Sequence, residues 1–243
     1  MRVFKKLIIT PIIICALLFA SCSIKLEDTH KEAINGIYEN NVISSNVVVE
    51  TYTFLGVKSS QGSGVIFSKN GSTYYALTNN HVIYDGYRAL IKDAYGERLM
   101  AEVVCSDVEY DLAVIRFNSD VDYYVPKICE TDPQISENVI CIGNPNGLVN
   151  SVTIGEVVDF KQVPALNGDT LKDDEGSNVT FSVIQHDAHI DEGSSGGAIF
   201  NYNYEICGIN YASGRTEDGE FVHGYAVPPT KILEFLQKNN INL

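Results

Sequence analysis

Three side chains that could act together in nucleophilic catalysis lie in separate parts of the chain. His81 stands in ALTNNHVI, Asp111 opens the run DLAVIRF, and Ser195 lies in GSSGGAIF. In such a set the serine hydroxyl attacks a carbonyl, the imidazole takes and returns its proton, and the carboxylate fixes the imidazole tautomer. Each residue alone has a simpler explanation, because glycine-serine clusters are usually loops and a single histidine is usually a surface or core residue. The hypothesis therefore depends on the elements around these residues.

The elements that must position these residues have the pattern of short strands. From residue 46 onward, β-branched and aromatic runs such as GVIFS, TYYALT and LAVIRF alternate with turn residues at short intervals. This pattern is typical of an all-β sandwich or of barrels, and it disfavours βαβ units. A polar stretch over 118–137 divides the runs, which predicts a first barrel over about 46–120 and a second over about 135–228. Apolar positions in PTKILEFLQKNN predict a helix over about 229–239.

The composition limits the class of partner. The chain has 243 residues and a formal net charge of −14 at pH 7, with 17 basic and 31 acidic side chains. A negative excess of this size argues against a nucleic-acid-binding surface. No CxxC pair occurs, so we expect no metal site. Cys105, Cys129, Cys141 and Cys207 lie in or beside apolar runs; they could pair in three ways, and we favour free thiols.

The first residues resemble the signal of a bacterial lipoprotein. The basic MRVFKK precedes the apolar LIITPIIICALLFA, which is too short to span a bilayer comfortably, and FASC then places small residues before a cysteine. The resemblance implies a leader over 1–21, cleavage before Cys22 and acylation of Cys22, and hence a membrane-anchored protein outside the cytoplasm. An ordinary signal cut nearby, or an uncleaved anchor, is the alternative. Residues 22–45 are polar and are expected to form a tether with a short helix.

Taken together and in their order along the chain, the motifs resemble those of the chymotrypsin-like serine proteases, and most of all those of the HtrA/Deg branch. GSGVIF, TNNHVI, DLAVI, IGNPNGL, DEGSSGGAIF and GYAVP occur in that family's order between residues 62 and 228. The resemblance implies two six-stranded antiparallel β-barrels in a protease domain over 46–243. It also implies a serine endopeptidase that needs no cofactor and acts on proteins or peptides. We expect no additional PDZ domain of the kind that the family often carries, because the stretch after residue 228 is too short for one.

The resemblance assigns roles to individual residues. His81 is the general base and acid, Asp111 orients it, and Ser195 is the nucleophile. The backbone N–H groups of Gly193 and Ser195 form the oxyanion hole, and both must aim at one point, which demands a backbone turn that glycine permits. Ser194 is then the neighbour of the nucleophile.

The primary specificity pocket is carried over only in part. Its walls would be the segment before the nucleophile and the strand after it, which here supply His189, Ile190, Asn210, Tyr211 and Ala212. No acid stands at the pocket base, and Asn210 occupies the place where glutamate-specific relatives have a histidine, so both charged preferences are disfavoured. Ile190 favours a modest apolar P1 residue such as valine, alanine or leucine, whereas a His189 that faced the pocket would favour glutamate.

Two other interpretations stay open at the level of the sequence. One is a protease-like binding protein without turnover, although a binding module has no need to retain all three groups. The other is a latent enzyme whose oxyanion turn becomes ordered only when substrate binds.

Overall fold

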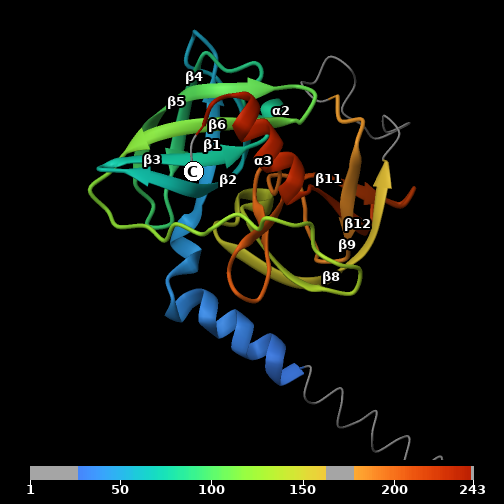
Figure 1. The fold of residues 1–243 in the computed structure, drawn as a ribbon. Helices are drawn as coiled ribbons and strands as arrows, with labels where there is room; N and C mark the ends of the chain where they lie inside the picture. Colours follow the sequence, from blue (N-terminus) through green and yellow to red (C-terminus); the bar gives the residue numbers. More distant parts are fainter. Residues whose placement is uncertain (1–26, 163–177, 242–243) are drawn as a thin grey trace, which may run out of the picture.

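The computed structural model describes residues 27–162 and 178–241, which contain two closed antiparallel β-barrels (Figure 1). The first barrel consists of β1 (Asn46–Tyr52), β2 (Lys58–Asn70), β3 (Thr73–Thr78), β4 (Arg88–Lys92), β5 (Arg98–Asp107) and β6 (Leu112–Asn118). The second consists of β7 (Asn138–Gly143), β8 (Ser151–Gln162), β9 (Ser182–His186), β10 (Ala198–Phe200), β11 (Ile206–Arg215) and β12 (Phe221–Val227). Around the barrels the strand orders are β1-β2-β3-β6-β5-β4 and β10-β11-β12-β9-β8-β7. The predicted fold of two six-stranded barrels is therefore confirmed.

Short helices lie before the barrels, at their turns and after them. A helix over 27–39 and the 3₁₀ turn η1 (Val42–Ser45) precede β1. α2 (Asn80–Ile83) follows β3, η2 (Pro145–Gly147) follows β7, and α3 (Pro229–Lys238) follows β12. Within the described residues, no helix is both long and apolar enough to cross a membrane. The expected leader over 1–21 and Cys22 lie outside the described residues.

Neighbouring residues of one strand supply different hydrophobic cores. In β6, Val114 lies in the core shared by the barrels, whereas Ile115 lies inside the first barrel. In β7, Ile140 lies in the shared core and Val139 lies inside the second barrel. Because side chains alternate between the two faces of a strand, a strand buried on both faces needs a nearly continuous apolar run. This requirement explains why the apolar run LAVIRF of β6 directly follows Asp111.

The cysteines belong to this packing. Cys105, Cys129, Cys141 and Cys207 are free thiols in the structure, in agreement with the interpretation that the sequence favoured. Burial raises the pKa of the Cys141 thiol to about 12, so this side chain packs as a neutral group at neutral pH.

α3 joins the shared core to the first barrel. The side chains of Ile232, Phe235 and Leu236 are buried in the shared core, as the predicted apolar face of this helix requires. On its other side, Tyr110 Oη donates a hydrogen bond to Glu234 at 2.6 Å. The helix therefore fastens the turn between β5 and β6, which is the turn that carries Asp111.

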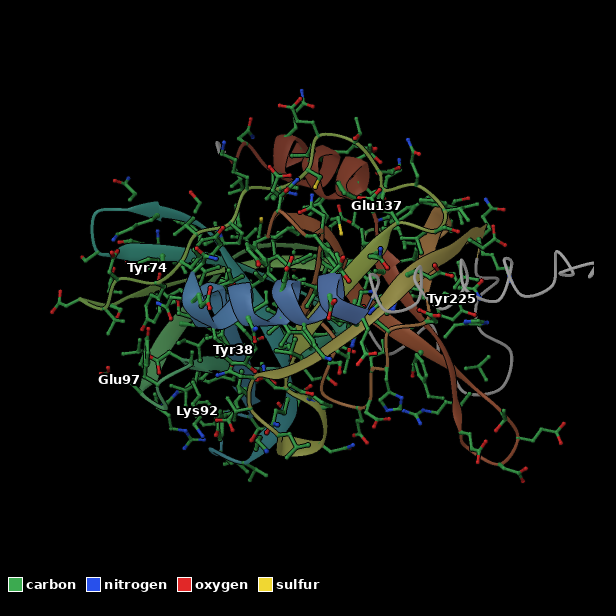
Figure 2. The ribbon with its side chains drawn as sticks, turned by 90° about the horizontal axis from the view of Figure 1, so that it is seen from below. Tyr38, Tyr74, Lys92, Glu97, Glu137 and Tyr225 are labelled. Carbon is green, nitrogen blue, oxygen red and sulfur yellow. The ribbon has the colours of Figure 1, made fainter. Side chains whose placement is uncertain are left out.

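The helix over 27–39 covers the shared core from another side (Figure 2). Ala33 and Ile37 are buried in that core together with residues of both barrels. Tyr204 Oη donates to Ala33 O at 3.2 Å, and this ring lies so close to Gly36 that any Cβ there would overlap the hydroxyl. This helix therefore packs on the barrels rather than extending away from them.

Candidate active site

His81 and Asp111 meet at the paired ends of β3 and β6. His81 lies on α2 directly after β3, Asp111 directly precedes β6, and these two strands pair antiparallel. Asp111 Oδ2 lies 2.8 Å from His81 Nδ1, and Asp111 Oδ1 accepts a hydrogen bond from the His81 backbone N–H at 2.9 Å. The carboxylate is fully buried, while the His81 side chain is 14 % exposed. A carboxylate so placed selects the tautomer with the proton on Nδ1, which leaves Nε2 as an acceptor.

The turn that carries Asp111 is fixed from two directions. Asp111 has a φ of 50°, in the left-handed region that aspartate adopts more readily than most residues. Asn79 Nδ2 donates to Asp111 O at 2.8 Å. At the end of β5, just before the turn, Asp107 forms an ion pair with Lys238 of α3 at 2.8 Å. The backbone of this turn, and not a flexible side chain, therefore determines where the carboxylate lies.

Ser195 lies beside the helical turn that carries His81. Gly62 of β2 stands between them, since a Cβ at this glycine would lie 2.7 Å from the Val82 side chain and 2.9 Å from Ser195 O. Among the contacts of the described residues, no hydrogen bond joins Ser195 Oγ to His81. Such bonds are often long without substrate and tighten only when substrate binds. The structure thus brings all three candidate catalytic residues to one place at the junction of the barrels.

The turn before and after Ser195 requires glycine at two positions. Gly193 has a φ of 95° and Gly196 has a φ of 85°. A Cβ at Gly193 would lie 2.7 Å from Asn144 O, and one at Gly196 would lie 2.1 Å from Ser63 O. The expected need for glycine around the serine therefore has two causes, the backbone conformation and the close approach of other backbone oxygens.

Two backbone donors of this turn are uncommitted. In the part of the chain that the structure describes, neither the N–H of Gly193 nor that of Ser195 donates a hydrogen bond within the protein. Glu192 O accepts from Asn146 N at 2.7 Å, and Ser194 O accepts at 2.9 Å from the N–H of the third residue after it. The C=O and N–H of a trans peptide point in opposite directions, so both bonds turn the free N–H groups away from these partners. Both N–H groups are therefore available to an acceptor from outside the protein.

A hollow of about 10 Å³ adjoins this turn. Its wall includes Ile190, Ser194 and Asn210, together with residues of β7 and β8. Tyr211 and Ala212, the other two expected pocket residues, pack against the shared core, where Tyr211 is buried. A volume of this size is that of about one water molecule, so the wall must move before even a small side chain can enter.

His189 borders the same hollow, but its ring is held at the surface. Nε2 lies 3.2 Å from Asp191 Oδ2, the ring centre lies 4.7 Å from that of Phe221, and the side chain is 58 % exposed. Arg215 also donates to Asp191, and this guanidinium lowers the pKa of the carboxyl. The alternative in which His189 faces the pocket base therefore lacks support from this geometry.

His186 is buried behind the hollow. Its Nε2 lies 2.8 Å from Asn210 Oδ1, and its Nδ1 lies 4.0 Å from Cys141 Sγ. Burial lowers the pKa of His186 to about 4, so the imidazole is neutral at neutral pH. His186, which lies behind Asn210, therefore offers no positive charge to a bound substrate.

A larger hollow, of about 470 Å³, also borders Gly193. It is lined by Lys58–Gln61 of β2, by Asn146 and Gly147, and by Glu192. The lining is polar and carries one charge of each sign. It could receive a second part of an extended substrate.

Three contributors to the site did not emerge from the sequence as functional residues. Asn79 holds the Asp111 backbone, Asn146 holds the Glu192 carbonyl, and His186 lies behind Asn210. Asn79 and Asn146 stand inside motifs that resemble those of the protease family, which is the only signal that the sequence carries for them. Their partners lie far away in the chain and become neighbours only through the barrel topology.

Comparison with known families bears on this site. A family model described as a trypsin-like peptidase domain matches residues 62–209, more than half of the chain. The chain belongs to the trypsin-like peptidases. The matched range contains His81, Asp111 and Ser195, whereas Asn210, Tyr211 and Ala212 lie just beyond it.

Relatives of this trypsin-like peptidase confirm its resemblance to the HtrA branch. It is 33 % identical over 188 residues to the serine protease Do-like HtrA of Lactococcus lactis subsp. cremoris, with 74 % of this chain and 45 % of the relative covered. It is 33 % identical over 172 residues to the periplasmic serine endoprotease DegP of Salmonella typhimurium, with 70 % of this chain and 34 % of the relative covered. The chain thus spans less than half the length of these curated relatives.

A solved structure has the same arrangement of barrels. The serine endoprotease from Yersinia pestis superposes on this trypsin-like peptidase with a TM-score of 0.68 and 29 % sequence identity. The superposition covers 85 % of this chain and 66 % of that chain.

Proposed function

We propose that this trypsin-like peptidase is a serine endopeptidase that hydrolyses peptide bonds through an acyl-enzyme. The observation that carries the proposal is the contact of both Asp111 carboxylate oxygens with His81, beside a serine turn with two uncommitted N–H groups. The relatives named above are serine proteases, which supports the same reaction class. The proposed reaction needs no cofactor.

In the first half of the proposed reaction, Ser195 Oγ attacks the carbonyl carbon of the scissile bond. His81 Nε2 takes the hydroxyl proton, and the adjacent Asp111 carboxylate stabilises the resulting imidazolium. The carbonyl oxygen becomes an oxyanion and accepts hydrogen bonds from the N–H groups of Gly193 and Ser195. The imidazolium then gives its proton to the amine nitrogen, the C–N bond breaks, and the acyl group stays on Ser195.

Water completes the proposed cycle. His81 Nε2 takes a proton from a water molecule as the water oxygen attacks the ester carbon, and the oxyanion again forms at the same two N–H groups. The imidazolium returns the proton to Ser195 Oγ when the C–O bond of the ester breaks. The products are a free carboxylate and the regenerated serine.

We expect a small aliphatic residue at P1. The hollow beside Ile190 is small, so its wall must move to admit valine, whose full burial would then gain roughly 1.5 to 3 kcal/mol from apolar transfer. An arginine there would be stranded without a partner, at a cost of several kcal/mol. Asn210 and the neutral His186 offer no cation to a glutamate. These properties together favour valine or alanine over a charged residue.

Proteins outside the cytoplasm are the proposed substrates, with the enzyme held at a membrane. The Salmonella relative is a periplasmic endoprotease, and the leader of this chain resembles a lipoprotein signal. Acyl chains on Cys22 would supply the anchor, since the net charge of −14 gives no basic surface for anionic lipids.

A fluorophosphonate probe on the mature protein tests the proposal. We expect covalent labelling of the wild type and of Ser194→Ala, and none of Ser195→Ala. Folded wild-type protein that stays unlabelled with and without a peptide substrate would overturn the proposal in favour of a protease-like binding protein. Labelling that needs the peptide would identify the latent form of the same enzyme.

A further inference from the structure

Ser63 of β2 is a fully buried polar residue of the first barrel that contacts the nucleophile turn of the second. We propose that Ser63 is a positioning residue that holds the oxyanion turn in its substrate-binding geometry. The inference rests on the proposed endopeptidase function and assigns a further residue to that site.

Ser63 contacts two carbonyl groups of the turn. Its backbone N–H donates to Ser195 O at 2.7 Å, and its Oγ donates to Gly193 O at 2.7 Å. These carbonyls belong to the peptides 193–194 and 195–196. The proposed oxyanion donors belong to the peptides 192–193 and 194–195. Ser63 therefore fixes the two peptides that flank the one carrying the Ser195 N–H.

The direction of the Ser63 hydroxyl bond is determined by its other partners. Asn144 approaches Ser63 Oγ with two N–H donors, its backbone N at 2.9 Å and its side-chain Nδ2 at 3.1 Å. A hydroxyl has one proton and two lone pairs, so both lone pairs serve Asn144 and the proton remains for Gly193 O. The hydroxyl has no unused hydrogen-bonding capacity and no alternative orientation.

The side-chain amide of Asn144 is fixed by hydrogen bonds of its own, so it holds the Ser63 hydroxyl in place. Asn144 Oδ1 accepts from Asn150 N at 3.1 Å, and Nδ2 donates to Val47 O at 3.0 Å. A backbone N–H can only donate and a carbonyl can only accept, which fixes the orientation of the amide. Asn46 Nδ2 donates to Asn144 Oδ1 at 2.9 Å. A buried network thus runs from the first barrel to the turn.

The turn needs this support because glycine makes it easy to deform. Gly193 has no Cβ and a φ of 95°, so its own backbone imposes little preference on the rotation of the following peptide. When Gly193 O loses the Ser63 hydroxyl, the 193–194 peptide is held only by the bond from Ser194 N–H to Asp191 O at 2.9 Å, so it can tilt and misalign the neighbouring N–H groups of Gly193 and Ser195. The oxyanion then loses stabilisation, whereas substrate side chains still bind in their pockets.

Ser63→Ala tests the proposal, with Ser45→Ala as the matched control. Ser45 is equally buried and its Oγ also donates to a backbone carbonyl, Val42 O at 2.8 Å, but that carbonyl lies outside the turn. We expect Ser63→Ala to lower kcat at least about tenfold. The loss should be smaller than the about 10²- to 10³-fold loss that follows removal of an oxyanion donor. KM for a peptide with valine at P1 should change less than about threefold, because Ser63 does not contact the substrate side chains that determine binding before the reaction. Ser45→Ala should leave both constants near those of the wild type.

A peptidyl trifluoromethyl ketone provides the second measurement, because its adduct with the serine carries an oxyanion. Its inhibition constant should rise in Ser63→Ala by the same factor by which kcat falls. Ser63→Cys keeps a weak donor of similar size, and we expect intermediate values of kcat and inhibition, so this variant decides the matter if Ser63→Ala does not fold. If the wild type is active and the folded Ser63 variants keep its kcat, this inference is wrong while the proposed function stands. The same holds if Ser45→Ala loses as much kcat as Ser63→Ala. An inactive wild type overturns the proposed function.

Discussion

Both oxygens of the Asp111 carboxylate are engaged by His81, one by Nδ1 at 2.8 Å and the other by the backbone N–H at 2.9 Å. The second bond couples the position of the carboxylate to the first turn of α2, so the imidazole and its partner cannot shift independently. A carboxylate with these two contacts is acceptor-only, which keeps the proton of the neutral imidazole on Nδ1.

Asp111→Asn should abolish most activity without unfolding the protein. The amide keeps the shape of the carboxylate but can present a donor to Nδ1, which favours the wrong tautomer, and kcat should fall about 10⁴-fold. Steady-state kinetics on the purified variant measures this, and circular dichroism checks the fold. Glu109→Gln, an exposed acid two residues earlier, is the control and should retain wild-type kcat. Equal kcat in Asp111→Asn and the wild type would contradict the orienting role.

Alanine at Gly196 should be far more costly than alanine at Gly219. The two glycines have nearly the same φ, 85° and 84°, but a Cβ at Gly196 would lie 2.1 Å from Ser63 O, whereas Gly219 has no atom within 4 Å. The left-handed conformation alone should cost Gly219→Ala about 1 to 2 kcal/mol. Gly196→Ala should lose roughly 3 to 5 kcal/mol because the overlap is added. Urea unfolding of both variants gives the two values, and similar losses would show that the turn relaxes freely.

His186 should make the protein less stable in mild acid. Burial lowers the pKa of this imidazole from 6.5 to about 4, so between these pH values the unfolded chain binds a proton that the folded chain does not. Stability therefore falls as the pH drops from 6.5 to 4, by roughly 3 kcal/mol in total from this group. His186→Gln should remove that part of the slope in urea unfolding at pH 7 and pH 4.5. His189→Gln, at an exposed position, should keep it; equal slopes in His186→Gln and the wild type would mean that other groups cause the dependence.

Cleavage of a peptide library should follow small aliphatic P1 residues at both pH 5.5 and pH 8. The hollow beside Ile190 is small, and the His189 ring is occupied by Asp191 and Phe221. Ile190→Ala should widen the P1 preference toward larger aliphatic residues, whereas His189→Ala should leave it unchanged. Mass spectrometry of the digests identifies the sites. A glutamate preference that fades as the pH rises would assign the specificity to a protonated His189 instead.

Cys22→Ser should release the protein from membranes or leave its precursor unprocessed. The reason is that two or more acyl chains hold a protein stably at a bilayer, whereas a protein without them depends on surface charge, which is negative here. Fractionation and N-terminal mass analysis of wild-type and variant protein make the measurement. A soluble wild type that begins at a residue other than Cys22 would exclude the lipoprotein interpretation.

The sequence predicted strands such as β6 and β7 well because most of their residues are buried on both faces. Val114 and Ile115 must both be apolar to serve two cores, so the run is conspicuous in the sequence. Histidines near the nucleophile were harder to place. His186 is buried and His189 is exposed, although both stand in the same short segment, because their surroundings are set by strand pairing and by Asp191. The partners of the Ser63 hydroxyl, Gly193 and Asn144, could not be predicted because they come from the second barrel.

α3 has a consequence for the order in which the site can be completed. Its contacts through Glu234 and Lys238 support the turn of Asp111, although more than a hundred residues separate them in the chain. Synthesis proceeds from the N-terminus, so the first barrel emerges long before the helix that fastens this turn. A chain interrupted before residue 229 would contain His81 and Ser195 but would lack the outer support of the carboxylate. Such a fragment is expected to hydrolyse little, so the proposed activity depends on a helix that follows both barrels in the chain.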